Sequence, residues 1–268
     1  MHGSESRATT RTVPPHPSTH VLATRDQITR RRIARRWIIG VGVAVVLTAS
    51  VLVLLSIGLV RMAPAWWRTT HPDDPATIRA AEDIENDVVN VIYEVREAPA
   101  ETWTVVLRAP DANAWLNTRL TPWLLNADAE FVWPEEISDL QVEFDEGLIH
   151  LGVRIDDGEN SQILSATLRP FFDDKGALWV RAESAYVGRL PIPADWVVGR
   201  ADAHWPDVLP ARLLEEPLTR HLLGALTGKT PLAADPVFDL GDGRRVRLLG
   251  LAPEQGKLRI TCRTEFEE

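Results

Sequence analysis

The residues best suited to chemistry are scattered along this chain. A single cysteine, Cys262, leaves no partner for a disulfide and no thiolate cluster for a metal. The histidines after the apolar run, His71, His150, His204 and His221, lack the spacing of a metal site. The motifs HExxH, GxSxG and CxxC are also missing. We therefore expect no catalytic residues, no metal and no cofactor, and we predict that the protein is not an enzyme.

Two local patterns resemble ligand sites. The run from Gly224 to Thr230 is similar to a phosphate-binding loop, but it has three residues between its glycines and follows a helical pattern. A helix C-cap at Gly228 explains it better. The acidic runs at Asp156–Asn160 and Asp173–Asp174 offer oxygen ligands without the spacing of a calcium loop, and hairpin turns explain the same residues.

Aromatic side chains are the remaining candidates for a binding site. Tryptophans line apolar grooves, but they also fill ordinary cores, so both interpretations stay open. The candidate ligand-binding residues are Trp103, Trp115, Trp123, Trp133, Trp179 and Trp196. If they surround a groove, its ligand is a lipid or another hydrophobic molecule.

An apolar run at residues 37–60 determines on which side of a membrane the candidate residues lie. It contains 24 residues without a charge and follows the basic cluster RRRIARR. As a helix it spans about 36 Å, enough to cross a hydrocarbon core of about 30 Å. Because flanking arginines stay on the cytoplasmic side, we expect the N-terminus inside and the C-terminal part outside the plasma (inner) membrane. The alternative is a cleavable signal peptide, but such peptides have shorter apolar regions.

The run divides the chain into four parts. We expect a basic, disordered cytoplasmic tail (residues 1–36), a transmembrane helix (37–60), a tether (61–75) and an extracytoplasmic domain (76–268). The tail carries eight arginines against two acidic residues, so the remainder has 21 basic and 36 acidic residues, a net charge of −15. Such an acidic domain repels nucleic acid, which we exclude as a partner.

Periodicity in the outer part predicts an α+β domain with a curved antiparallel β-sheet packed against helices. We expect an amphipathic helix over residues 74–98, a strand at 101–109 and a helix after Asp111. Four strands follow as a meander, with turns at residues 145–147 and 173–176. Ile149, Leu151, Val153 and Ile155 should share one face, and Leu148, His150, Gly152 and Arg154 the other. A helix at 213–226 and a hairpin turning at 253–256 complete the domain.

Some of these residues resemble the YpmS-type membrane-anchored proteins of bacteria over about residues 100–200. The similarity lies in DANAWLN at the start of a helix, in Gly188 at the end of a strand, and in the turn Leu190-Pro191-Ile192-Pro193. The resemblance implies a twisted antiparallel sheet wrapped against a helix, an arrangement similar to small lipid-binding modules of the envelope. It implies no catalytic residues.

We therefore expect a single-pass membrane protein whose external domain binds a lipid or other hydrophobic ligand. Its partners are the bilayer, through residues 37–60, and that ligand or an envelope protein. The alternative function is a non-enzymatic envelope scaffold, or protein-interaction module, that binds another protein through an exposed sheet edge or its acidic face. An external hydrolase is the third possibility, without a motif to support it.

Overall fold

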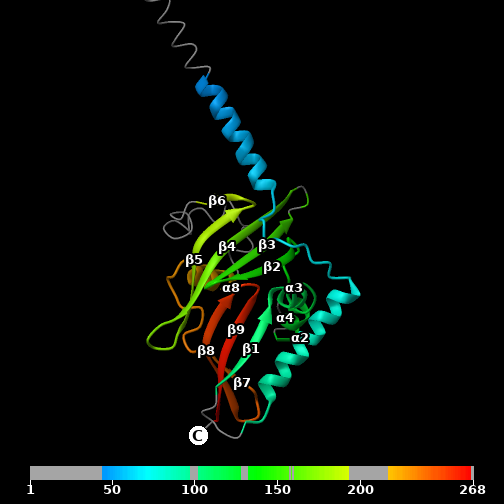
Figure 1. Cartoon of the computed structure of the whole chain (residues 1–268), viewed down its shortest axis with the longest axis vertical. Coiled ribbons are helices and arrows are strands. Elements are labelled where there is room, and N and C mark those ends of the chain that lie inside the picture. Colours follow the sequence, from blue (N-terminus) through cyan, green and yellow to red (C-terminus); the bar gives the residue numbers. More distant parts are fainter. Residues whose placement is uncertain are drawn as a thin grey trace, which may run out of the picture. The chain divides into compact units, whose positions relative to one another are not determined.

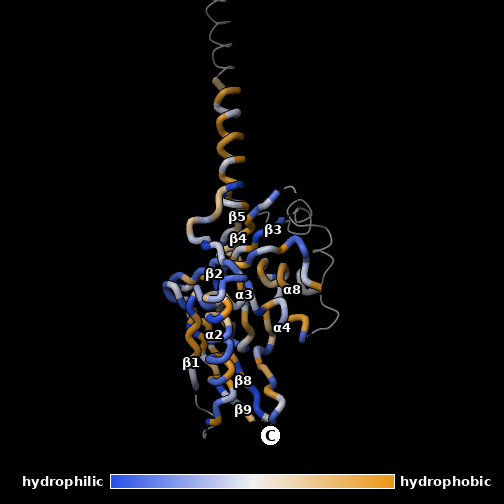
Figure 2. Tube along the Cα trace, turned by 90° about the vertical axis from the view of Figure 1, so that its right-hand side faces the viewer, coloured by the Kyte–Doolittle hydropathy of each residue, from blue (hydrophilic) through white to orange (hydrophobic). Residues whose placement is uncertain are grey.

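The computed structural model describes residues 44–96, 102–127, 132–156, 158, 160–192 and 217–266. The chain divides into two compact units, Met1–Leu55 and Ser56–Glu268. Within the described residues one helix, Ala44–Arg61, is long and apolar enough to cross a membrane, with a mean hydropathy of 2.3. Figure 2 shows the apolar character of this helix. The predicted span is confirmed to this extent, while its residues 37–43 and the basic tail lie outside the described part.

The second unit confirms the α+β class but contains two antiparallel sheets instead of one curved sheet (Figure 1). The larger sheet has the strand order β2-β3-β4-β5-β6, and the smaller has the order β1-β9-β8-β7. The larger sheet consists of β2 (Ile137–Asp145), β3 (Leu148–Asp156), β4 (Ser161–Phe172), β5 (Leu178–Val187) and β6 (Leu190–Ile192). The smaller consists of β1 (Thr102–Arg108), β7 (Val237–Asp239), β8 (Arg244–Glu254) and β9 (Lys257–Phe266). The predicted meander is thus confirmed as β2 to β5.

The free edge of β2 is occupied by helix α3 (Ala109–Thr118). Asn113 donates to the carbonyl of Val142 at 3.0 Å and accepts from its N–H at 2.6 Å. One helical turn later, Asn117 makes the same pair of bonds with Leu140, at 2.6 and 2.9 Å. These two amides make the backbone bonds that a neighbouring strand would make, and β9 of the hairpin β8–β9 pairs with β1 in the smaller sheet.

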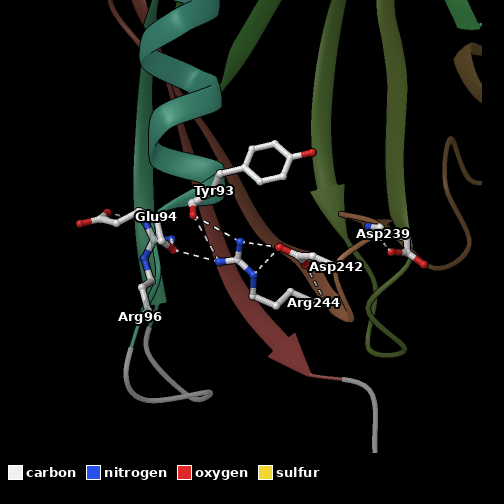
Figure 3. Close-up of polar contacts among 7 residues, drawn as sticks. Tyr93, Glu94, Arg96, Asp239, Asp242 and Arg244 are labelled. Carbon is white, nitrogen blue, oxygen red and sulfur yellow. Dashed lines mark hydrogen bonds and ion pairs between the residues drawn. The ribbon is translucent and has the colours of Figure 1, made fainter.

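Helix α2 (Pro75–Tyr93) begins where the sequence predicts, because Asp74 accepts the N–H of Ala76 at 3.0 Å and Pro75 starts the first turn. It ends before the predicted Ala98. Arg244 donates to the carbonyl of Tyr93 at 3.3 Å and is itself held by Asp242 at 2.6 Å (Figure 3). A cation at this position favours the helix end, because the last carbonyls carry partial negative charge.

The two remaining described helices are α4 (Leu120–Ala127) and α8 (Pro217–Leu226). Gly228, with a φ of +69°, follows α8, and the N–H of Lys229 donates to the carbonyl of Gly224 at 2.9 Å. This is the geometry of a glycine C-cap, so the interpretation of GALTGKT as the end of a helix is confirmed. The predicted residues 213–216 of this helix lie outside the described part.

Two apolar clusters bind the sheets to each other. Leu168, Leu178 and Val180 of the larger sheet pack with Leu248 and Leu251 of β8. A second cluster joins Phe144 of β2 and Leu258 of β9 to alanines of α3. The turns of the two hairpins also bond, since the N–H of Gly147 donates to the carbonyl of Pro253 at 2.9 Å. The smaller sheet is therefore fixed to the larger one on both sides of the core.

The side chains of β3 alternate between two chemically different faces of the larger sheet. Ile149 pairs with Phe144 and Leu168, and it packs into the core, as the alternation predicts. Leu151, on the same face, is 36% exposed, so this apolar face is only partly covered. The opposite face carries His150, Gly152 and Arg154, and it forms the floor of the candidate site.

Candidate functional site

The polar face of the larger sheet is covered by a segment that we call the strap, residues 62–71. Trp66 and Trp67 of the strap lie on β3. The ring of Trp66 lies 5.8 Å from that of His150, and the guanidinium of Arg154 lies 5.7 Å from the centre of the Trp67 ring. Gly152 makes this contact possible, because a Cβ there would approach Trp67 Cζ3 to 2.6 Å. Part of the predicted tether is thus packed on the domain.

The start of the strap is fixed by the turn between β5 and β6. The backbone N–H of Arg189 donates to the carbonyl of Leu59 at 2.8 Å, and its Nε donates to the carbonyl of Ala63 at 2.8 Å. Gly188 adopts a φ of +59°, and a Cβ at this position would lie 2.2 Å from the carbonyl oxygen of Val60. Only glycine allows the turn to approach the last helical turn so closely.

A buried polar cluster holds the far end of the strap. The amide of Gln141 donates to Thr70 Oγ1 at 2.7 Å and to Asp139 Oδ1 at 2.8 Å. Gln141 is 1% exposed and Asp139 is 7% exposed. Burial raises the pKa of Asp139, although the hydrogen bond from Gln141 and the charges of Arg154 and His71 oppose this change. The strap therefore covers a carboxyl group that is costly to ionise.

Between these two attachments a hollow of about 240 Å³ opens beside the strap. Its walls differ in chemistry. Pro64, Ala65 and Trp66 of the strap supply apolar lining, while His150, Ser165, Thr167, Tyr186 and Arg189 supply polar lining, and Ala166 and Gly188 complete it. His150 Nδ1 and Thr167 Oγ1 lie 3.1 Å apart, which fixes the imidazole against β4. A site of this kind binds a ligand with both an apolar part and a polar or anionic part.

Three of the predicted tryptophans that the structure describes lie apart from this hollow and from one another. Trp103 is 9% exposed in the core of the smaller sheet, where its indole donates to Thr264 Oγ1 at 3.1 Å. Trp133 donates to the carbonyl of Ile137 at 3.0 Å. Trp179 lies on β5, and Trp196 lies outside the described residues.

Among the predicted tryptophans within the described residues, one pair lies together, Trp115 and Trp123, whose ring centres are 6.3 Å apart. Trp115 donates to Glu85 of α2 at 3.2 Å, and Trp123 is 55% exposed on α4. Those of the six predicted tryptophans that the structure describes are thus distributed over the core, two helices, a hairpin and the segment before β2, and they do not line a common groove.

The residues of the hollow were not among the predicted site residues. One signal in the sequence could have found them, because a glycine inside a strand indicates close approach of another part of the chain. Gly152 is such a residue, and it lies between His150 and Arg154 on one face. Its partner could not be deduced, since nothing in the local pattern links Trp67 to position 152.

The described residues contain no group of three or more His, Cys, Asp or Glu side chains that could hold a metal ion. The acidic turn at Asp173 serves its hairpin, because its carboxylate accepts the N–H groups of Lys175 and Ala177 at 2.9 and 3.0 Å. This bonding supports the interpretation of Asp173 as a turn residue.

Neither protein-family models, nor curated proteins, nor solved structures match this chain. The resemblance to the YpmS-type proteins therefore stays a prediction. Two of its elements have clear structural roles here, since Asn113 binds the edge of β2 and Gly188 approaches Val60. Pro193, the last residue of its turn, lies outside the described part.

Proposed function

We propose that this protein is a single-pass, non-enzymatic membrane protein whose extracytoplasmic domain binds the headgroup of an anionic lipid in the hollow beside the strap. The observation that carries this proposal is the bond between Arg189 and the carbonyl of Leu59. Leu59 belongs to the apolar helix Ala44–Arg61, and Nε of Arg189 donates to the carbonyl of Ala63, two residues beyond that helix, so the guanidinium lies just past its last turn.

Chain length supports a headgroup at this position. The hollow begins at Pro64, three residues after the helix ends at Arg61, and three residues reach at most about 11 Å. The polar layer of a bilayer occupies about 5–8 Å on each side of the hydrocarbon core. If the helix spans the membrane, the hollow opens in or just above this layer.

The lining supports an anionic lipid. Arg189 is exposed, and a guanidinium pairs well with phosphate oxygens because it offers parallel N–H donors. Thr167 and Tyr186 also line the hollow, and their hydroxyl groups can act as donors. The apolar wall at Trp66 suits the glycerol and first acyl carbons. Arg189 is a local positive charge in a part of the chain that is acidic as a whole, since residues 37–268 have a net charge of −15.

The lipid is tested with the full chain in nanodiscs of equal parts phosphatidylglycerol and phosphatidylcholine. Native mass spectrometry after release should show retained phosphatidylglycerol on the wild type and about tenfold less on Arg189→Gln. Arg189→Lys keeps the charge while losing the Nε bond to Ala63, so it should retain most of the lipid. Arg181→Gln, an exposed arginine of β5, is the matched control. Equal retention by wild type and Arg189→Gln would contradict the proposal.

The topology is tested separately with a C-terminal reporter. A reporter that is active only outside the cytoplasm should give a signal, and one that is active only in the cytosol should stay silent. The opposite result would place the domain inside the cell, and the proposed site would then face the inner leaflet.

A second candidate function, a protein-interaction module, is favoured by one observation. Trp123 and Leu125 of α4 are 55% and 45% exposed, and Val132 is 70% exposed. Exposed apolar side chains so close in sequence suit a protein partner. The edge of β2 is unsuited to this role, because Asn113 and Asn117 already occupy it. A photo-crosslinker at position 123 should capture a defined protein in cells if this function holds, and no adduct if it fails.

A further inference from the structure

A second hollow, of about 250 Å³, opens on the hairpin of β4 and β5, away from the residues of the first. Phe171 and Trp179 form one side of it. They are a cross-strand pair whose rings are 6.3 Å apart and nearly parallel, at 9°. Phe171 is 43% exposed, so an apolar aromatic surface remains open to solvent.

The hairpin holds this aromatic surface rigidly. Trp179 Nε1 donates to Asp173 Oδ2 at 3.0 Å, and the other oxygen of Asp173 accepts two backbone N–H groups of the turn. These bonds fix the indole in one orientation before any ligand arrives. A ring that is already ordered binds with a smaller entropic cost.

Two side chains of opposite charge, Asp173 and Arg181, line the same hollow as the rings. Asp173 is an acceptor, and its pKa is lowered, first by the hydrogen bond from Trp179, so it stays ionised at neutral pH. Arg181 follows Trp179 on the same face and makes no hydrogen bond or salt bridge within the described part of the chain. Gly228 lies against it, since an added Cβ would be 3.8 Å from Arg181 Nε, an ordinary contact.

We propose that this hollow binds a neutral pyranose ring, as part of an oligosaccharide. The face of an aromatic ring is electron-rich, so the weakly positive C–H hydrogens on one side of a sugar ring pack favourably against it. Sugar hydroxyl groups both donate and accept, and they can therefore pair with Asp173 and with Arg181.

A neutral ring fits this site better than an anion. The carboxylate of Asp173 lies in the same hollow as the guanidinium, so the two formal charges cancel. An anionic ligand would gain from Arg181 but lose to Asp173 and to the acidic domain, whose long-range field is repulsive. A nucleotide, which also stacks on aromatic rings, carries this unfavourable charge.

The test uses the full chain in lipid nanodiscs, because maltoside detergents carry sugars that would compete. Saturation-transfer NMR and calorimetric titration measure binding of cellotetraose, a neutral tetramer of glucose. We expect a dissociation constant on the order of 1 mM, about tenfold weaker for Phe171→Ala and for Arg181→Gln. Phe238→Ala removes an aromatic ring that is 61% exposed elsewhere and is the matched control.

Binding is compared for three ligands: cellotetraose, tetragalacturonate and adenosine monophosphate. Tetragalacturonate, the acidic counterpart, should bind more weakly than cellotetraose, and adenosine monophosphate should not bind measurably. Stronger binding of either anion than of the neutral sugar would overturn the proposal. So would binding that is unchanged in Phe171→Ala, or no binding of cellotetraose to a wild type that is folded by circular dichroism.

Discussion

Gly152 of β3 lies directly beneath the indole of Trp67, so close that a Cβ atom at position 152 would be 2.6 Å from Cζ3 of that ring. A glycine inside a strand weakens the strand, because it has no side chain to pack. Here the strap supplies that packing, since both of its tryptophans lie over the glycine. The contact couples the strap to the sheet, and the substitution Gly152→Ala, which adds one methyl group, tests it.

Gly152→Ala should lower the free energy of unfolding by about 1–3 kcal/mol, because the methyl group overpacks a filled contact. Urea denaturation of the full chain in micelles measures this loss. Limited proteolysis should also cut sooner after Arg68, in the strap. Gly250→Ala, inside β8, is the control, since its Cβ would be 3.7 Å from Thr261, an ordinary contact. Equal losses in the two variants would mean that the strap is not held by this contact.

Asn113 and Asn117 should be more important for stability than other asparagines. Replacement of either one by Ala removes two hydrogen bonds to β2, and we expect a loss of about 1–3 kcal/mol each, because backbone groups at the strand edge lose their partners. Thermal unfolding followed by circular dichroism checks this. Asn126→Ala on exposed α4 is the matched variant, and a comparable loss there would argue against the edge role.

Cys262 should report unfolding of the smaller sheet. Its thiol is 6% exposed, and burial raises its pKa to about 11. From an ordinary value of 9.0, this change lowers the thiolate fraction at pH 8 roughly 100-fold. Iodoacetamide should therefore alkylate the native chain slowly and the urea-unfolded chain quickly. A cysteine placed at exposed Asp174 should react quickly in both states, and a fast native reaction of Cys262 would contradict this burial.

Asp139 should make stability depend on pH. Its folded pKa is raised by burial, so its favourable contribution is present below the unfolded pKa and is lost as pH rises through the folded pKa. Asp139→Asn keeps the acceptor for Gln141 without the buried charge. Its stability relative to the wild type should therefore increase from pH 4 to pH 7 in urea titrations. Asp145→Asn, exposed at the end of β2, is the control.

The opposite trend for Asp139→Asn would be informative. If the variant became less stable than the wild type as pH rises, the attraction of Asp139 to Arg154 and His71 would outweigh the cost of burial. The strap would then be held by charge rather than by neutral hydrogen bonds.

Local patterns in the sequence were sufficient for the strands of the meander and for both hairpin turns. Alternation and the residues Asp145-Glu146-Gly147 predict β2 and β3, because strand and turn preferences depend on neighbours in the chain. The end of α2 was predicted too late. Its position depends on Arg244, about 150 residues further on, and no helical pattern contains that information.

The division into two sheets was beyond local patterns for the same reason. Pairing of Trp103 with Cys262 joins residues that are far apart, and an alternating strand does not specify its neighbour. The six tryptophans were treated as one candidate site because their residue type suits a groove. Their separate locations depend on individual partners such as Thr264 for Trp103 and Asp173 for Trp179.

The pairing of β1 with β9 also determines when the domain can form. Thr102 lies opposite Arg263, so the first strand must wait during synthesis until nearly the whole chain has emerged. A polypeptide that stops before Lys257 leaves β1 without a strand partner and β8 paired only with β7. Such a nascent chain would already hold its apolar helix while the smaller sheet lacks the strand that joins β1 to β8.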